Sequence, residues 1–411
     1  MRRVNSQELH RYSIDDFSGG INTDSAKTLP NEISIGTNFN LTQRGLLEVR
    51  GGSETKNSSN LIPVTSGIGP TSLFELWTRD LATGVKTRHQ FGTAKTNLFS
   101  IQTTGDTLVV TGLTNLDTGL TNDLVPSVAK MQNKAFLVNG KESRWTDGIT
   151  SEEVGVEMPT VDPVHNTSYA TGGGMSDGTY RFYYAYGRST NYGFYGEVGD
   201  YVEVTLSGGG AAQKVSIDCK ATNSTSTSAD KIYLFRTKPG DNASWYQVNT
   251  ASNPDDNSTV TVECLLGDNE ILDTTLYDED HTPPISGVKY IQAGGNRMYY
   301  ADDNYVYYSK PNLPECVPAL NIIKFSEDDG ENITSIGIIL NYILVTKQTS
   351  TYIIDMSVVG EHDPILISNN IGCVSHRTME PLMNGQITMW LSQEGFVATD
   401  GVQVTSVVKD K

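Results

Sequence analysis

The sequence of 411 residues predicts an all-β protein, and three features support this. Its 39 glycines and 20 tyrosines are typical of many short strands that are joined by tight turns and carry aromatic rings on their faces. Hardly any window shows the i, i+3, i+4, i+7 spacing of apolar residues that an amphipathic helix requires. Apolar residues make up only 37% of the chain, yet its length allows a large core and two or three domains.

Residues 1–60 are polar and rich in turn-forming residues, which predicts an extended N-terminal arm. The distinctive runs are Phe17-Ser18-Gly19-Gly20-Ile21-Asn22 and, after Asn38, Gly45-Leu46-Leu47-Glu48-Val49-Arg50-Gly51-Gly52. Their glycines permit the positive φ angles of tight turns. We expect one or two short strands in this arm.

A weak repeat of strand, polar turn and strand occupies residues 61–159 and 283–411. Its copies lie at 133–148, 296–309, 341–355 and 385–401, and a possible fifth copy lies at 73–101. Repeated hairpins of this kind are typical of propeller blades, in which each small sheet exposes one face to its neighbour. We therefore predict a β-propeller-like main domain that is built from two parts of the chain.

Residues 160–282 interrupt this repeat with a different pattern. Strand-like runs alternate with loops rich in Asn, Ser and Gly, and they lie at 178–186, 200–206, 214–217, 231–236, 245–248 and 260–264. Strands at this spacing fit an immunoglobulin- or fibronectin-like sandwich of about 120 residues. We expect this sandwich to be an inserted domain that ends at Pro283-Pro284.

The formal net charge of −18 argues against tight or sequence-specific binding of nucleic acid. Proteins that bind DNA tightly present a basic face to the phosphates, whereas this chain has 48 acidic and 30 basic residues. An acidic surface is nevertheless compatible with a duct through which DNA slides without sticking, and it also favours solubility.

The cysteines and the N-terminus indicate in which cellular compartment the protein is expected to fold. Cys219, Cys264, Cys316 and Cys373 lie far apart, which predicts reduced and mostly buried thiols without metal-ligand spacing. No apolar h-region follows the positively charged N-terminus, and no run approaches 18 apolar residues. We expect neither a secretion signal nor a membrane span.

No motif in the sequence points to an enzyme. The six histidines are scattered, with no pair at the i, i+3 or i, i+4 spacing of metal ligands on a helix. The Gly-x-Ser-x-Gly, P-loop and Gly-x-Gly-x-x-Gly patterns are missing. We therefore expect no catalytic residue, no metal and no cofactor.

Acidic clusters at 278–280, 302–303 and 327–332 leave three alternatives open. The first is solvated hairpin turns, which favour Asp, Asn and Gly. The second is a cation site at 327–332, because hard cations such as calcium prefer several oxygens from a loop bent at glycine. The third is glycoside hydrolysis by paired carboxylates, with Asp328 or Asp329 as candidates, although the Ser-x-Asp-x-Gly-x-Thr-Trp boxes of sialidase propellers are missing.

Several motifs resemble the tail nozzle or tail hub proteins of short-tailed (podovirus-type) bacteriophages. The run 17–22, Asn38-Phe39 and the run 45–52 are similar to the "F-x-G-G-hydrophobic-N … N … G-hydrophobic-x-x-R-x-G" opening of that family. In the middle of the chain, Asn296-Arg297-Met298 followed by Tyr307-Tyr308-Ser309 is similar to the family's "N-R-L … V-x-x-S" blade. Near the C-terminus, Gly372–Ser375 precedes Ser392–Phe396 and Asp400-Gly401, as in the family. The run Lys231–Thr237 resembles the sandwich domain that interrupts the propeller in these proteins. Together they cover most of the chain.

The resemblance implies a structural subunit of the virion that is assembled in the host cytoplasm. It implies a homo-oligomeric ring, a hexamer, that lies below the portal and adaptor (head-to-tail connector) proteins and carries tail fibre, spike or plug proteins. The lumen of such a ring retains packaged DNA and makes transient, non-specific contact with it during ejection. Acidic residues that face the lumen repel phosphates within about 8–10 Å at physiological salt.

We expect the N-terminal arm to hold the subunit in its ring or against the adaptor, since the arm has few residues that could form a core of its own. The interface residues in this hypothesis are Phe17, Gly19, Gly20, Asn22, Asn38 and Arg50.

Two other functions remain as alternatives. The first is a receptor- or glycan-binding tail protein, an adhesin, in which Trp145, Trp245 and the loop Tyr192-Gly193-Phe194-Tyr195 stack on sugars. The second is the glycosidase propeller described above, which requires turnover on glycans.

Overall fold

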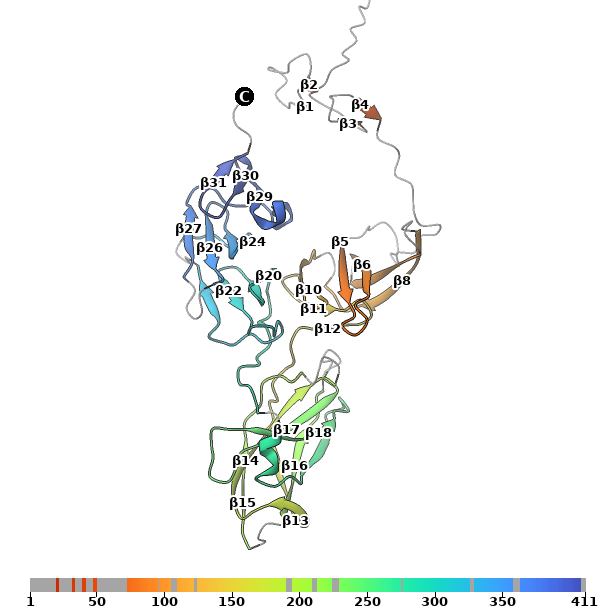
Figure 1. The fold of residues 1–411 in the computed structure, drawn as a ribbon, viewed down its shortest axis with the longest axis vertical. Helices are drawn as coiled ribbons and strands as arrows, with labels where there is room; N and C mark the ends of the chain where they lie inside the picture. The colour runs from red at the N-terminus through yellow and green to blue at the C-terminus, as the bar shows by residue number, and fades with distance from the viewer. Residues whose placement is uncertain are drawn as a thin grey trace, which may run out of the picture. The chain divides into compact units, whose positions relative to one another are not determined.

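The computed structural model describes residues 72–407, with short gaps, and four short strands nearer the N-terminus (Figure 1). The gaps are residues 95, 105–108, 122–123, 190–193, 209–212, 224–228, 275, 326–328 and 358–362. The chain divides by its internal contacts into one unit of Met1–Asn60 with Thr107–Val109 and a second of Leu61–Asp106 with Val110–Lys411.

The first unit contains two small strand pairs. Strands β1 (Gly20–Ile21) and β2 (Glu32–Ile33) pair in parallel, and β3 (Phe39–Leu41) and β4 (Leu47–Val49) form an antiparallel hairpin. The described part of the predicted arm therefore contains four short strands, where the sequence predicted one or two.

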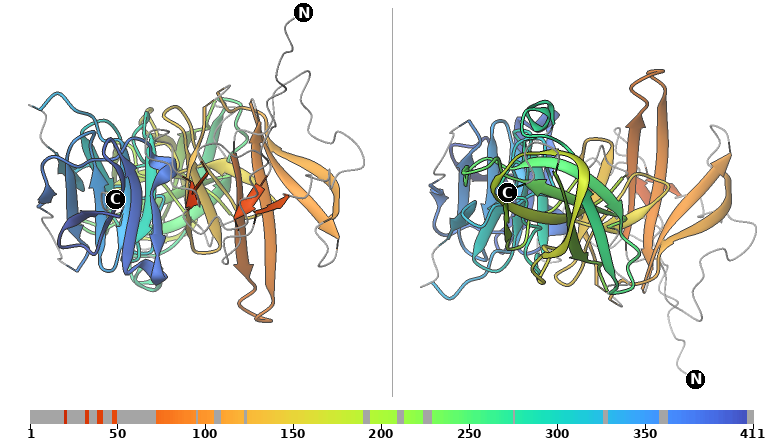
Figure 2. Two further views of the ribbon diagram at one scale, coloured as in Figure 1. Left: turned by 90° about the horizontal axis from the view of Figure 1, so that it is seen from above. Right: turned by 90° about the horizontal axis from the view of Figure 1, so that it is seen from below.

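The second unit contains five four-stranded antiparallel sheets, in each of which the strands follow one another in chain order. The first sheet contains β5 (Ser72–Arg79), β6 (Lys86–Ala94), β7 (Asn97–Thr104) and β8 (Val109–Asp117). The second contains β9 (Ser127–Met131), β10 (Lys134–Val138), β11 (Ser143–Thr146) and β12 (Ser151–Glu153). Both views in Figure 2 show the long β5–β6 hairpin extending beyond its neighbours.

The other three sheets follow the sandwich in the sequence. The third contains β20 (Tyr290–Gly294), β21 (Arg297–Ala301), β22 (Tyr305–Tyr308) and β23 (Ile322–Lys324). The fourth contains β24 (Ser335–Ile339), β25 (Tyr342–Thr346), β26 (Thr351–Asp355) and β27 (Ile365–Ser368). The fifth contains β28 (Glu380–Leu382), β29 (Ile387–Ser392), β30 (Gly395–Thr399) and β31 (Val404–Ser406).

Hydrophobic clusters join each of these sheets face to face with the next one. One cluster joins the first sheet to the second, and others join the second to the third, the third to the fourth and the fourth to the fifth. Successive residues of one strand pack against different neighbouring sheets: Tyr300 packs against the second sheet, and Tyr299 packs against the fourth. This arrangement of blades confirms the predicted β-propeller-like fold.

The turns explain why the repeat is visible in the sequence. The β9–β10 turn has positive φ at Gln132 (52°) and Asn133 (62°), and the β20–β21 turn has it at Gly295 (56°) and Asn296 (59°). Two successive residues with positive φ are the signature of a type I′ hairpin turn, in which Asn and Gly are favoured. The asparagines that open the repeats at 133 and 296 therefore mark these turns.

The predicted sandwich lies between the second and third sheets in the sequence. Its three-stranded sheet contains β13 (Val164–Met175), β16 (Gln213–Lys220) and β19 (Thr259–Cys264). Its four-stranded sheet has the order β15-β14-β17-β18, from β15 (Val202–Leu206), β14 (Gly178–Gly187), β17 (Lys231–Arg236) and β18 (Tyr246–Ser252). Seven strands in sheets of four and three are typical of immunoglobulin-type sandwiches.

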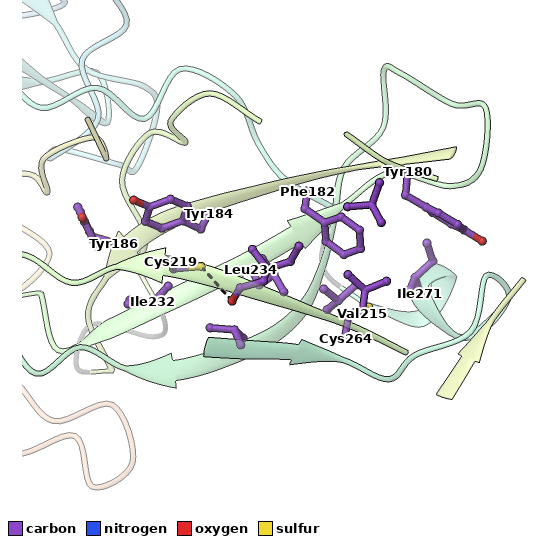
Figure 3. Close-up of a cluster of buried hydrophobic side chains, with 14 of the residues drawn as sticks. Tyr180, Phe182, Tyr184, Tyr186, Val215, Cys219, Ile232, Leu234, Cys264 and Ile271 are labelled. Atoms are coloured by element: carbon purple, nitrogen blue, oxygen red, sulfur yellow. Dashed lines mark hydrogen bonds between the residues drawn. The ribbon is translucent and has the colours of Figure 1, made fainter. Parts of the chain in front are cut away.

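The core of the sandwich contains side chains from both of its sheets. Figure 3 shows Tyr180, Phe182 and Tyr184 of β14 on the same side of the strand as Leu234 of β17, facing Val215 of β16. The opposite face of β14 is also buried, because Tyr183 and Ala185 belong to a second cluster with Tyr195, Val198 and Tyr277. Segments that precede β15 and follow β19 therefore cover the outer face of this sheet.

The described residues contain no α-helix, only the short 3₁₀ turns η1 (Glu270–Asp273), η2 (His376–Thr378) and η3 (Met383–Gly385). In this described part, we find no helical segment with the length and hydropathy that crossing a bilayer demands. All four cysteines are buried and free, as the sequence predicted.

Candidate functional site

The interface residues that the sequence proposes lie almost entirely outside the described residues. Gly20 is the exception: it begins β1 and pairs with Glu32 of β2. Phe17, Gly19, Asn22, Asn38 and Arg50 are outside the described part of the chain. Their role as an interface stays a prediction.

A buried arginine links the sandwich to the propeller blades. Arg188 follows the end of β14, and only 1% of its side chain is exposed. Its Nη1 donates to Oε2 of Glu315 at 2.5 Å, and its Nη2 donates to the carbonyl oxygens of Glu153 and Gly155 at 2.8 Å each. Its Nε lies 3.1 Å from Oε2 of Glu152. One guanidinium thus binds the end of β12 and the loop between β22 and β23.

Glu315, at the other end of this pair, holds a second cation. Nζ of Lys134 on β10 lies 3.0 Å from Oε1 of Glu315, and it also lies 3.5 Å from the centre of the Trp145 ring. Burial lowers the pKa of Lys134, and the nearby Glu315 carboxylate opposes that shift. We call Lys134, Glu152, Arg188 and Glu315 the junction cluster. It connects the second sheet, the third sheet and the sandwich through side chains that are mostly removed from water.

A cavity of about 840 Å³ lies beside the junction cluster. It is lined by Arg79 at the end of β5 and Leu81 of the β5–β6 turn, by Lys134 and Glu315, and by Tyr195 of the sandwich. Both signs of charge and apolar side chains meet there, so the lining favours no single class of ligand. Among the described residues no group of three His, Cys, Asp or Glu side chains is placed to hold a metal ion.

A second polar site lies where the first strands of several blades begin. The ring of His376 bonds through Nε2 to Oγ of Ser127 at 2.9 Å and through Nδ1 to Oγ of Ser335 at 3.0 Å. These serines begin β9 and β24, so the imidazole connects the second and fourth sheets. A pocket of about 250 Å³ opens here, and Lys289, Tyr290 and Arg377 are among the residues that line it.

Burial lowers the pKa of His376 to about 4, which predicts a loss of stability in acid. The unfolded chain binds the proton at a pKa near 6.5, so protonation favours unfolding as the pH falls from 6.5 toward 4. We expect the His376→Gln variant to lack about 2–3 kcal/mol of this pH dependence, since an amide accepts and donates without titrating. Urea denaturation of both proteins between pH 7 and 4 measures the difference, and parallel curves would contradict the assignment.

The acidic clusters that the sequence singled out form turns and ion pairs where they are described. Oδ1 of Asp302 accepts from the backbone N–H groups of Asn304 and Tyr305 at 3.0 and 2.9 Å. Asp329 pairs with the fully buried Nζ of Lys347 at 2.8 Å and also accepts from the N–H of Glu331. Glu327 and Asp328 lie outside the described residues.

The aromatic side chains proposed to stack on sugars pack inside the protein instead. Trp145 is 3% exposed beneath Lys134, and Phe194 and Tyr195 are also buried. Trp245 stacks between Tyr183 (4.0 Å between centroids) and Tyr277 (5.2 Å). Tyr192 and Gly193 are outside the described residues. None of the four described rings therefore presents a free face for a sugar.

The sequence did not indicate Arg188, Glu315 or His376 as site residues. Of these three residues, Arg188 is the one that the sequence could have indicated, because a charged residue at the end of the aromatic, buried strand β14 is unusual. Glu315 lies in a loop with no distinguishing pattern around it, and His376 begins η2 directly after the Gly372–Ser375 motif, which gives no indication of a role for the histidine itself.

Comparisons with known proteins identify no family. No protein-family profile and no curated protein matches the chain.

Solved structures show distant likeness. The WD40 domain of Pan2 from Neurospora crassa is 7% identical, over 77% of this chain and 72% of that one, with a TM-score of 0.27. Apo AztD from Citrobacter koseri is 10% identical, over 80% and 84% of the two chains, with a TM-score of 0.24. A protein of Bacteroides uniformis provisionally described as a 6-phosphogluconolactonase is 10% identical, over 81% and 87%, with a TM-score of 0.31. At these scores we transfer no function from any of them.

Proposed function

We propose that the chain is a structural subunit of the tail hub or nozzle of a short-tailed bacteriophage. In this proposal it forms a ring, a hexamer, below the portal and adaptor proteins, retains the packaged DNA and conducts it during ejection. The observation that carries the proposal is that the residues resembling this family form turns and contacts that fix the blades.

The blade motif around Asn296 illustrates this support. Asn296 adopts the positive φ of the β20–β21 turn, and Nη1 of Arg297 donates to the carbonyl oxygen of Ser309 at 2.6 Å. Oγ of Ser309 in turn accepts from the N–H of Met298 at 2.9 Å. Because these residues bond to one another across the sheet, the spacing of the motif has a structural cause.

The motifs near the C-terminus have similar roles. The carbonyl of Gly372 accepts from Nε1 of the fully buried Trp390 at 2.9 Å, and a Cβ on Gly372 would lie 2.2 Å from the carbonyl oxygen of Lys347. Only glycine fits there. Oγ of Ser392 accepts from the N–H of Glu394 and so closes the β29–β30 turn before Phe396.

A rigid scaffold of this kind suits a conduit, which has no reaction to perform. Cryo-electron microscopy of the virion tests the proposal directly: we expect the chain as a sixfold ring on the portal axis, beneath the adaptor. A peripheral position would favour the adhesin, and a position in the capsid shell or in a host membrane would exclude a tail hub.

The N-terminal arm gives a genetic test of the same proposal. We expect the Phe17→Ala, Arg50→Ala double variant to fold normally in residues 72–407, since the described residues of the five sheets pack on one another through hydrophobic clusters of their own. Phage that carry it should leak DNA or lack tails, because the arm is proposed to hold the subunit in place. Particle counts and plaque titres measure this, and normal infectious particles would show that the arm is dispensable.

A further inference from the structure

The pocket beside His376 is built by four sheets together. Its volume is about 250 Å³, and its lining comes from the starts of β9 and β20 and from the segments that lead into β24 and β28. These are the first strands of the second, third, fourth and fifth sheets, and β20 contacts both β9 and β24. The pocket therefore follows from the arrangement of the blades and does not lie within a single loop.

The described residues that line this pocket include two basic side chains and none that is acidic. Lys289 and Arg377 are the two cations, and both are exposed. His376 adds no charge at neutral pH, because burial lowers its pKa to about 4. Tyr290 and Ser375 add hydroxyl groups to the same lining. The net charge of −18 repels anions at long range, so an anion is held only where local donors of this kind converge.

An exposed ion pair positions the ammonium group of Lys289. Its Nζ bonds to Oδ1 of Asp303, and the two side chains are 42% and 48% exposed. Solvent screens such a pair, and Nζ has three donors, so a ligand in the pocket can bind the same cation. The cation also acts on the hydroxyl of Tyr290: burial raises the pKa of Tyr290, and the nearby Lys289 opposes that shift.

We propose that this pocket binds a phosphate group. A tetrahedral oxyanion has acceptor oxygens in several directions, which suits donors that come from segments of different sheets. The ammonium of Lys289 binds phosphate as a point charge, and the guanidinium of Arg377 has the geometry for two parallel N–H bonds to it. Val125, Pro126 and Val374 complete the lining with apolar atoms.

The volume limits what carries the phosphate. The pocket is smaller than those that hold drug-sized molecules, so it fits a phosphate with a small substituent. A small free molecule and the end of a nucleic-acid strand present the same terminal phosphate. The site goes beyond the proposed tail function and does not depend on it, since purified protein is enough to test it.

The first experiment locates binding by protection of an amine. Lys289 is exposed enough to react with an acetylating reagent, and peptide mass spectrometry follows each lysine separately. We expect inorganic phosphate to slow the acetylation of Lys289 several-fold relative to sodium chloride at the same ionic strength. Lys86 on β6 is also exposed and lies outside the pocket, so its reaction should not change.

The second experiment measures affinity by equilibrium dialysis with radiolabelled phosphate. Lys289→Gln and Arg377→Gln each remove one charge at an exposed site, and each should bind phosphate at least about tenfold more weakly than the wild type. Lys86→Gln makes the same change of charge elsewhere and should bind as the wild type does. Asp303→Asn breaks the same ion pair as Lys289→Gln but keeps the cation, so it should retain or strengthen binding.

Short single strands of DNA distinguish the two sources of phosphate. If a 5′-phosphorylated strand protects Lys289 and the same strand with a 5′-hydroxyl does not, the site takes a strand end. If neither strand protects while inorganic phosphate does, the site takes a small molecule. Four results would overturn the proposal: no protection by phosphate, an equal loss of affinity in Lys86→Gln or in Asp303→Asn and in Lys289→Gln, full affinity in Arg377→Gln and Lys289→Gln, or equal protection by both strands, which would show a general attraction of polyanions.

Discussion

Replacing Arg188 with alanine should lower the free energy of unfolding by about 3–5 kcal/mol, because it leaves the buried carboxylate of Glu315 with one partner fewer. Glu315 is 3% exposed and cannot regain water without local opening. The carbonyls of Glu153 and Gly155 would also lose their donor. Urea denaturation measures the loss, and hydrogen exchange should show it first at β12 and at the loop between β22 and β23.

The matched control is the exposed ion pair of Arg88 and Glu75, whose side chains are 40% exposed. Glu75→Gln should lower the free energy of unfolding far less than Arg188→Ala does, since solvent screens such an exposed pair. A double-mutant cycle of Arg188→Ala with Glu315→Ala isolates the coupling, and it should exceed that of the exposed pair several-fold. If Arg188→Ala changed stability no more than Glu75→Gln does, the junction cluster would contribute little to holding the sandwich.

The elements that the sequence predicted best are those whose pattern is local. Asn133 and Asn296 mark two-residue turns because their backbone φ is positive, and each is followed by a short apolar run that is buried on both faces. Local patterns also predicted the 178–186 strand of the sandwich and the possible fifth copy of the repeat, which lies in the first sheet. Fold class therefore followed from short-range signals.

The junction cluster could not be predicted because its members are distant in the sequence. Arg188 and Glu315 are separated by 127 positions, and nothing in either local pattern indicates the other. The burial of the second face of β14 could not be predicted for the same reason, since Tyr277, which packs on that face, follows β19 and is distant from β14 in the sequence. Likewise, His376 connects two sheets only through its hydrogen bonds to Ser127 and Ser335, which are distant from it in the sequence.

Removing residues 160–282 and joining Pro159 to Pro283 through a short Gly/Ser bridge should leave a chain that still folds. Among the described residues, the four clusters that join the five sheets contain none from this segment, and the two sandwich clusters take nearly all of their members from it. The two parts therefore build largely separate cores, as the sequence predicted for an inserted domain.

The shortened chain should nevertheless be less stable, by about 4–6 kcal/mol, because some of its side chains complete the sandwich core. Val156 is 3% exposed and Cys316 is fully buried in that core, with Leu313 packed against it. Exposing each of these apolar groups costs about 1.5–3 kcal/mol. Glu315 keeps Lys134 as a partner and gains water, so its charge adds little to the loss. Thermal unfolding followed by near-ultraviolet circular dichroism should show one cooperative transition at a lower midpoint; an aggregate without a transition would mean that the segment belongs to the main core.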